Sequence, residues 1–341
     1  MKKKQDFKYT LFIKSLFLAI PFITLIGLYI VKDPFMILRE YDDYDHPEVR
    51  YPHFGYMTWM KYKKYDPIKH YDSFIIGASC SAAFQSYEWR KYIKGTPFRL
   101  LGSNENLYET AAKINKLIDE KGSKIKNILL VTDRTLLAVS TPESGLMHIY
   151  PQELSGKSMF EINKEFIKGY FTPEFLKPYL TYIVTNKCKK YEDQRINGGF
   201  LLWDKYTNDD IRVRDKEKEI KALGLEKFYE KCKDNFVNLP NKHQEEGAPV
   251  FSNVHIGIMK NLKNRIDSCH ISLKIAMGPQ LDGGYINSKD EQILYDIFDK
   301  KNVVIYNKKE YKHLETKYNF YDWIHYRLPI ANKILRDLYA N

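Results

Sequence analysis

The stretch DSFIIGASCS, residues 72–81, decides the fold that we expect for this chain. The apolar residues 74–76 are typical of a short buried strand, and Gly77 permits the tight turn that would end it. A helix that begins at Ser79 would point its free N–H groups at an atom reacting with the Ser79 hydroxyl. Serine is also common in turns and as a helix cap, so a catalytic role requires a base elsewhere in the chain.

Apolar runs of the same kind alternate with amphipathic segments along much of the chain. We expect strands at 73–76, 97–101, 125–132, 271–277 and 303–306. Helices with apolar residues on one face are expected at 82–93, 104–120, 250–268, 290–300 and 328–339. This alternation over short links predicts an α/β fold in which five parallel strands form a doubly wound sheet.

A long insertion at 134–249 separates the third strand from the fourth. Within it we expect helices at 160–169, 173–184 and 216–232 and a hairpin near 199–206. Solvated arginines and a core tryptophan are ordinary in such a segment, and a carbohydrate site is the alternative. The side chains that could line a carbohydrate site are Arg195, Trp203, Tyr206, Arg212 and Arg214.

The N-terminal residues predict a membrane anchor. Residues 10–31 are apolar except for Lys14, whose long side chain can reach the membrane interface. A helix of this length spans about 30 Å, the thickness of a bilayer core. A cleaved signal peptide is the alternative, but the bulky residues 28–31 offer no small-residue cleavage site. The lysine-rich flank at 1–9 predicts a cytoplasmic N-terminus and an extracytoplasmic location for the rest of the chain.

These segments give an expected layout in four parts. They are a cytoplasmic basic tail at 1–9, a transmembrane helix at 10–31, a juxtamembrane segment at 32–71 and the α/β domain at 72–341. The juxtamembrane segment has little clean periodicity, so we expect it to be irregular apart from a helical fragment at 59–62. The insertion at 134–249 lies inside the α/β domain.

The composition excludes some classes of protein. With 44% hydrophobic residues, the chain is not expected to be largely disordered. Its formal net charge of +11 would suit a nucleic-acid partner, but the lysines are spread along the chain without a recognition motif, so we expect no nucleic acid. Neither the four cysteines nor the nine histidines show the spacing of a metal site, and we expect no metal or other cofactor.

A base for Ser79 is available near the C-terminus, where residues 322–325 read DWIH. A carboxylate three residues before a histidine can accept the imidazole N–H, which leaves the other ring nitrogen free to deprotonate a hydroxyl. This loop follows the fifth strand and Ser79 follows the first, so both fall at the carboxyl edge of the sheet. We expect Ser79 as nucleophile, His325 as base and Asp322 as the carboxylate that orients it. A packed structural histidine is the alternative for His325, and Cys80 is more typical of small buried packing than of a nucleophile.

The blocks GASCS at 77–81 and DWIH at 322–325 resemble the first and last signature blocks of the SGNH, or GDSL-like, hydrolases. With its anchor, the chain looks like the branch of bacterial cell-envelope polysaccharide O-acetyltransferase proteins, and the D-alanylation protein of teichoic acid is a more distant similarity. The resemblance covers about residues 70–133 and 250–341, and it implies a three-layer α/β/α flavodoxin-like fold. It also implies ester chemistry through an acyl-serine. The implied partners are an envelope glycan, an acyl donor and a membrane-embedded acyl-delivery protein.

In that family a glycine after the second strand and an asparagine after the third complete the oxyanion hole. Gly102 matches the glycine, whereas residues 132–134 read TDR and lack the asparagine. Asn104 and Arg134 are therefore the candidates for holding an acyl oxygen or an anionic group. Each also has an ordinary interpretation: a strand-ending glycine at 102, a helix N-cap at Asn104, and an ion pair of Arg134 with Asp133. A non-catalytic glycan-binding or scaffold subunit is the alternative function.

Overall fold

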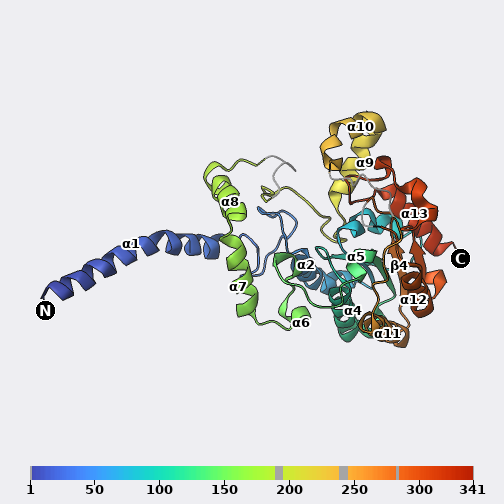
Figure 1. The fold of residues 1–341 in the computed structure, drawn as a ribbon, viewed down its shortest axis with the longest axis horizontal. Helices are drawn as coiled ribbons and strands as arrows, with labels where there is room; N and C mark the ends of the chain where they lie inside the picture. Colours follow the sequence, from blue (N-terminus) through green and yellow to red (C-terminus); the bar gives the residue numbers. More distant parts are fainter. Residues whose placement is uncertain (1, 189–194, 238–244, 282–283, 341) are drawn as a thin grey trace. The chain divides into compact units, whose positions relative to one another are not determined.

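The computed structural model of the chain describes residues 2–188, 195–237, 245–281 and 284–340. It divides into two compact units, one made of 1–51 with 163–200 and the other of 52–162 with 201–341. The second unit is an α/β structure that holds all the strands of the sheet (Figure 1).

Five parallel strands form the sheet, as the sequence predicted. They are β1 (Ser73–Gly77), β2 (Pro97–Leu101), β3 (Asn127–Thr132), β4 (Ser272–Met277) and β5 (Val303–Ile305). Their order is β2-β1-β3-β4-β5, one of the two common doubly wound orders. The chain leaves β1 toward one side of the sheet and returns to β3 on the other, so the carboxyl ends of β1 and β3 flank the topological switch point, where open α/β sheets bind ligands.

Helices cover both faces of the sheet, because successive strand residues point to opposite sides and both sets are apolar. In β1, Phe74 and Ile76 face one core and Ile75 faces the other. The first core is covered by α2 (Phe54–Lys69), α4 (Leu107–Lys121), α11 (Asn253–Ser268) and α12 (Ser288–Phe298). The second core is covered by the short η1 (Ser79–Ala83) and α3 (Ser86–Trp89) and by α13 (Leu328–Tyr339).

Helix α2 differs from the irregular segment that the sequence predicted there. Its sixteen residues run from Phe54 to Lys69, where only a fragment at 59–62 was expected. Trp59, Tyr62 and Tyr65 are buried in the first core. The Tyr62 ring contacts Phe74 of β1 and Phe98 of β2. Large aromatic rings supply this apolar face, so the usual aliphatic spacing of a buried helix is absent from the sequence.

Helix α4 begins at residue 107, three residues later than the expected 104–120, and its cap is Asn106 rather than Asn104. Asn106 Oδ1 accepts a hydrogen bond from the Glu109 N–H at 3.0 Å, and Glu109 accepts one from the Asn106 N–H at 3.2 Å. This reciprocal capping box satisfies two N–H groups that the first helical turn would otherwise leave unpaired. The helix expected at 82–93 is also shorter, because only η1 and α3 form there.

The insertion is helical, but the hairpin expected near 199–206 is wrong. Its helices are α5 (Arg134–Leu137), α6 (Gln152–Ser155), α7 (Met159–Tyr170), α8 (Pro173–Thr185), α9 (Ile211–Leu223) and α10 (Leu225–Lys231). Instead of a hairpin, the described residues form one isolated bridge between Trp203 and Asp210. The turn inside this bridge covers the free edge of β2: the Arg99 N–H donates to the Thr207 oxygen at 2.9 Å, and Asn208 Nδ2 donates to the Arg99 oxygen at 2.8 Å.

In the first unit, helix α1 (Lys2–Lys32) contains an apolar stretch at Leu11–Lys32 that is long enough to cross a membrane. The carboxyl end of this helix packs on the α7–α8 corner of the insertion. The rings of Tyr29 and Tyr170 meet edge to face with centroids 5.1 Å apart, and the Tyr170 hydroxyl donates to the Leu25 oxygen at 3.2 Å. This contact joins the carboxyl end of α1 to residues 163–200 in one compact unit.

Gly77 is the glycine whose substitution should damage the fold most. Its φ is +152°, and a Cβ there would overlap the carbonyl oxygen of Val131 in the neighbouring strand. Because the Val131 oxygen belongs to the backbone and a Cβ has no rotatable bond to move on, only separation of β1 from β3 would relieve the overlap. We expect Gly77→Ala to lower the free energy of unfolding by about 3 kcal/mol or more, measured as a fall in Tm of the purified protein in detergent.

Gly257→Ala is the matched control for this substitution. Gly257 lies inside α11, and nothing lies within 4 Å of the position that its Cβ would take. Alanine is favoured over glycine in a helix by about 1 kcal/mol, so this variant should be as stable as the wild type or more stable. An equal fall in Tm for both variants would contradict the role given to the β1–β3 contact.

Candidate active site

Ser79, His325 and Asp322 come together at the carboxyl edge of the sheet. Ser79 Oγ lies 2.7 Å from His325 Nε2, and His325 Nδ1 lies 2.9 Å from both carboxylate oxygens of Asp322. Ser79 is the first residue of η1, immediately after the turn that ends β1. The loop before α13 carries the other two side chains, as the spacing of the DWIH block predicted. An imidazole held this way can take the serine proton, because a carboxylate fixes its other nitrogen.

The Asp322 carboxylate is held in its ionised form. Burial alone would raise its pKa, but the hydrogen bond and charge of His325 and the backbone N–H groups of Ile324 and His325 lower that pKa to about 2. The two N–H groups lie 2.9 and 2.8 Å from Asp322 Oδ1. The carboxylate is therefore available to orient His325 and to stabilise an imidazolium at any pH above about 4.

A cavity of about 160 Å³ opens beside the Ser79 hydroxyl. It is lined by residues of η1, of α9 with its N-cap, and of the loop before α13: Ser79, Cys80, Ala82, Ala83, Asp210, Arg212, Val213, Lys216, Tyr321, Asp322, His325 and Tyr326. The cavity is small, so it has room for a small group rather than a long chain.

Gly102, which matches the family's glycine, and the substitute candidates Asn104 and Arg134 are not part of this lining. The Gly102 N–H donates to the Gly77 oxygen at 3.1 Å, so it is already paired. Asn104 is exposed in a left-handed conformation with φ of +49°. The Arg134 guanidinium packs against Gly247 and donates to the Ala248 oxygen at 3.2 Å.

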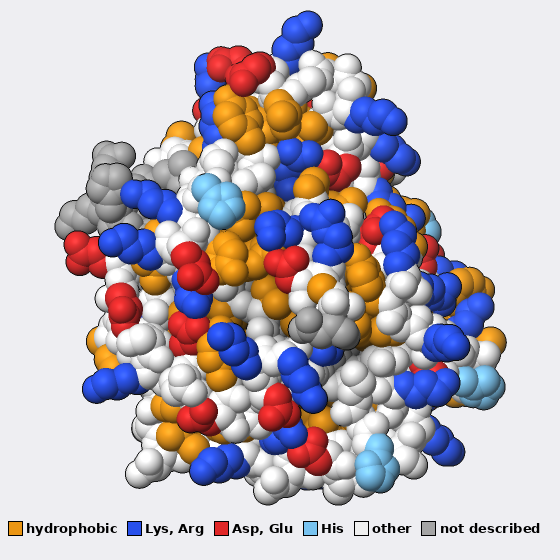
Figure 2. Space-filling model, turned by 90° about the vertical axis from the view of Figure 1, so that its right-hand side faces the viewer, with side chains coloured by type: hydrophobic (Ala, Val, Ile, Leu, Met, Phe, Trp, Pro, Cys, Tyr) orange, Lys and Arg blue, Asp and Glu red, His pale blue; other side chains and the backbone are white. Residues whose placement is uncertain are grey.

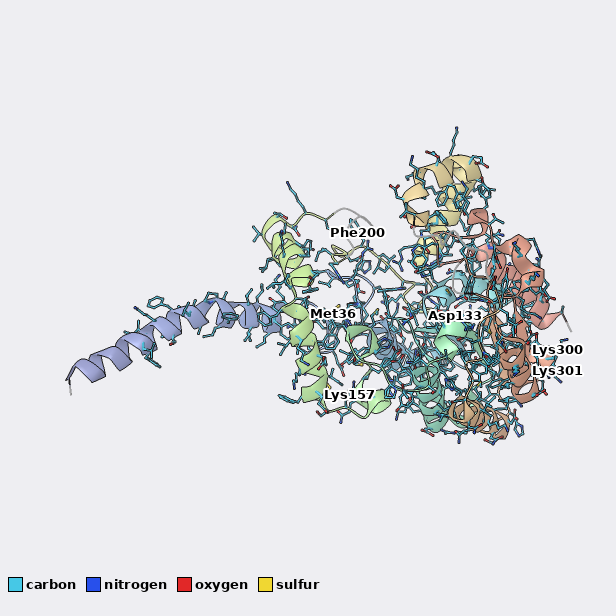
Figure 3. The ribbon with its side chains drawn as sticks, in the orientation of Figure 1. Met36, Asp133, Lys157, Phe200, Lys300 and Lys301 are labelled. Atoms are coloured by element: carbon cyan, nitrogen blue, oxygen red, sulfur yellow. The ribbon has the colours of Figure 1, made fainter. Side chains whose placement is uncertain are left out.

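Asp133, labelled in Figure 3, caps the short helix α5. It follows β3, where the SGNH hydrolases that the sequence resembles have their oxyanion asparagine. Asp133 Oδ1 accepts the Leu136 N–H at 2.9 Å and the Thr135 hydroxyl at 2.6 Å. The residues after β3 thus serve to begin a helix. On the turn that carries Ser79, the Ser79 N–H has no hydrogen-bond acceptor in the described part of the chain, so it is free to donate to a bound group.

Helix α9 supplies the part of the cavity that sequence reasoning missed. Asp209 accepts hydrogen bonds from the N–H and the hydroxyl of Ser86 at 2.8–3.1 Å, which holds the start of this helix beside α3. Asp210 caps α9 and forms a two-pronged ion pair with Arg212, at 2.9 and 2.6 Å. Of the five insertion residues considered for a carbohydrate site, Arg212 lines the cavity, whereas Trp203 is buried in contact with the Phe54 ring.

Lys216 lies one turn further along α9, with its ammonium 4.9 Å from the centre of the Tyr321 ring. Burial lowers the pKa of this lysine, while the nearby Asp322 carboxylate acts in the opposite direction. The sequence contains one signal for its position: aspartates at 209 and 210 before a helical segment are typical of a helix start. The sequence does not show that Lys216 lines the same cavity as Ser79, because this depends on how the insertion packs against the sheet.

No group of three or more potential metal ligands is found within the described ranges. On the face drawn in Figure 2, the Lys and Arg side chains are interspersed with Asp and Glu rather than gathered in one basic patch. In comparisons with protein-family models, curated proteins and solved structures, the chain has no significant match.

Proposed function

We propose that this protein is a membrane-anchored serine esterase or O-acyltransferase that works through an acyl-serine intermediate. The observation that carries the proposal is the 2.7 Å separation of Ser79 Oγ and His325 Nε2, with Asp322 on the other side of the ring. Serine alone is a weak nucleophile at neutral pH, and a base within hydrogen-bonding distance is what activates it.

In the proposed reaction, Ser79 Oγ attacks the carbonyl carbon of an acyl ester while its proton passes to His325 Nε2. The tetrahedral intermediate expels the alcohol, which takes that proton from His325, and the acyl group stays on Ser79. A sugar hydroxyl or water then gives its proton to His325 and attacks the acyl-serine. The bond between the acyl carbon and Ser79 Oγ breaks, Oγ takes that proton back from His325, and the acylated sugar or the free acid leaves. The Ser79 N–H, which lacks an acceptor in the described part of the chain, supports a role as one donor to the oxyanion.

The proposed substrates are acyl esters, acetyl esters among them, of cell-envelope glycans. The small cavity supports a short acyl group, and an anchor favours a surface polymer over a diffusing metabolite. A partner that delivers acyl groups through the membrane fits the same arrangement. The lysine-rich N-terminal flank supports a cytoplasmic tail with the α/β unit outside, and a reporter fused to the C-terminus tests that topology.

Labelling with a fluorophosphonate tests the proposed chemistry. We expect Ser79 Oγ to displace fluoride from phosphorus, so that mass spectrometry of peptides from the full-length protein places the phosphonyl group on Ser79. Heat-unfolded protein is the control and should not be labelled, because the reaction requires His325 in place.

The second candidate function is a non-catalytic glycan-binding or scaffold subunit of an envelope-modification complex. Two observations favour it: the N–H of Gly102, which matches the family's glycine, is already paired with Gly77, and Asp133 begins a helix where the family has its asparagine. A folded protein that the fluorophosphonate does not label would support this candidate and contradict the enzyme.

A further inference from the structure

Among the described residues, the lining of the Ser79 cavity contains one lysine, Lys216, that feels the charges of Asp322 and Asp210 but forms no close ion pair. The Lys216 ammonium has no carboxylate within 4 Å among the described residues, and its near neighbour is the face of the Tyr321 ring. The other charged groups of the lining have partners: Arg212 binds Asp210, and Asp322 binds His325. A partly buried lysine without a carboxylate partner is costly, which calls for an explanation beyond packing.

The helix that carries Lys216 is fixed to the loop that carries Asp322 and His325. The next residue of α9, Glu217, accepts hydrogen bonds from Arg327 Nε and Nη2 at 2.9 and 2.7 Å. Glu217 also accepts the Tyr321 hydroxyl at 2.7 Å. Tyr321 and Arg327 lie on either side of the DWIH loop, so this network fixes α9 to the segment that carries Asp322 and His325. The place of Lys216 on the lining of the Ser79 cavity therefore follows from how α9 is anchored.

We propose that Lys216 binds an anionic group, a carboxylate or a phosphate, on the molecule whose ester Ser79 attacks. The inference rests on the proposed function for its chemistry, and it makes the substrate an acyl ester that carries a negative charge close to the ester. A cationic side chain in a partly water-excluded cavity attracts such a group strongly. The Tyr321 ring beneath the ammonium restricts its motion, and Arg212 adds positive potential on the same helix.

The test compares two acetyl esters of nearly the same shape, 4-acetoxybenzoate and the neutral 4-acetoxybenzamide. We expect the wild-type protein to prefer the anionic ester in kcat/KM, and Lys216→Gln to reduce the anionic-to-neutral ratio about tenfold. Lys216→Arg should keep most of the preference. Lys218→Gln is the matched control, because Lys218 is an exposed lysine on the same helix and should leave the ratio unchanged.

A third ester, 4-acetoxyphenyl phosphate, distinguishes the two sources of negative charge. A Lys216-dependent preference for it over 4-acetoxybenzoate would indicate a phosphate-bearing substrate, and the reverse order a carboxylate-bearing one. The inference would be overturned if wild type and Lys216→Gln had the same anionic-to-neutral ratio of kcat/KM with both anionic esters. It would also be overturned if Lys216→Gln lowered kcat/KM equally for neutral and anionic esters, because that result indicates a structural role for the lysine.

A binding measurement separates this inference from the proposed chemistry. In a Ser79→Ala background, 4-hydroxybenzoate should raise Tm more than 4-hydroxybenzamide does, and adding Lys216→Gln should remove that difference. Because no ester is cleaved, this result is expected even if the site is not catalytic. Failure of Ser79 to react with a fluorophosphonate overturns the enzyme alone, whereas the absence of an anion preference here overturns the role of Lys216.

Discussion

Ser79→Ala should lower kcat/KM for p-nitrophenyl acetate by about 10⁴-fold and abolish the burst of p-nitrophenol that marks an acyl-serine. The variant removes the oxygen that lies 2.7 Å from His325 Nε2 and leaves the imidazole and its carboxylate in place. Without a nucleophile, His325 can act only on water, which has no fixed position in the site. The rate is measured on the purified full-length protein in detergent, together with fluorophosphonate labelling.

Ser81→Ala is the control from the same short helix. Ser81 is fully buried, and its hydroxyl has no hydrogen-bond partner in the described part of the chain. Removing an unsatisfied buried hydroxyl should cost no stability and no activity. Loss of activity in Ser81→Ala, or its retention in Ser79→Ala, would mean that the reacting serine has been assigned incorrectly.

The strands were predictable because each is a short apolar run that is buried on both faces. The bounds of β2 at 97–101 and of α13 at 328–339 match the expectation residue for residue. The elements that were predicted incorrectly have one physical cause in common: contacts between residues distant in sequence determine their structure. Helix α2 is held by aromatic rings that pack on the sheet, and the segment around Trp203 pairs with β2 through Thr207 and Asn208 instead of forming a hairpin.

The candidate site was predictable to the extent that it follows the sheet topology. Ser79 after β1 and the DWIH loop after β5 had to reach the same edge, because all five strands are parallel. The surroundings of that pair were not predictable. The N-cap of α4 is Asn106 rather than the expected Asn104, and the Gly102 N–H donates to the Gly77 oxygen. Lys216 enters from an insertion whose path depends on side-chain contacts, such as those of Asp209, that no local pattern specifies.

Asp322→Asn should lower kcat by about 10⁴-fold while the fold stays intact. The amide oxygen can still accept the Ile324 and His325 backbone N–H groups, which lie within 2.9 Å of Asp322 Oδ1 in the wild type. The amide nitrogen, however, cannot accept the imidazole N–H that two carboxylate oxygens now receive. The ring would then carry its proton on the nitrogen that faces Ser79, which prevents it from acting as the base.

Asp133→Asn is the matched control for that substitution, because asparagine caps a helix as well as aspartate does and Asp133 is not part of the cavity lining. The two variants should also differ in acid stability. The pKa of Asp322 falls from 3.8 to about 2 in the folded protein, so its contribution of about 2 kcal/mol is complete above pH 4 and is lost as the pH falls toward 2. Asp322→Asn lacks this contribution at every pH. Its Tm should therefore decline less than that of the wild type or Asp133→Asn between pH 5 and pH 2, and parallel declines in all three proteins would contradict the role given to the carboxylate.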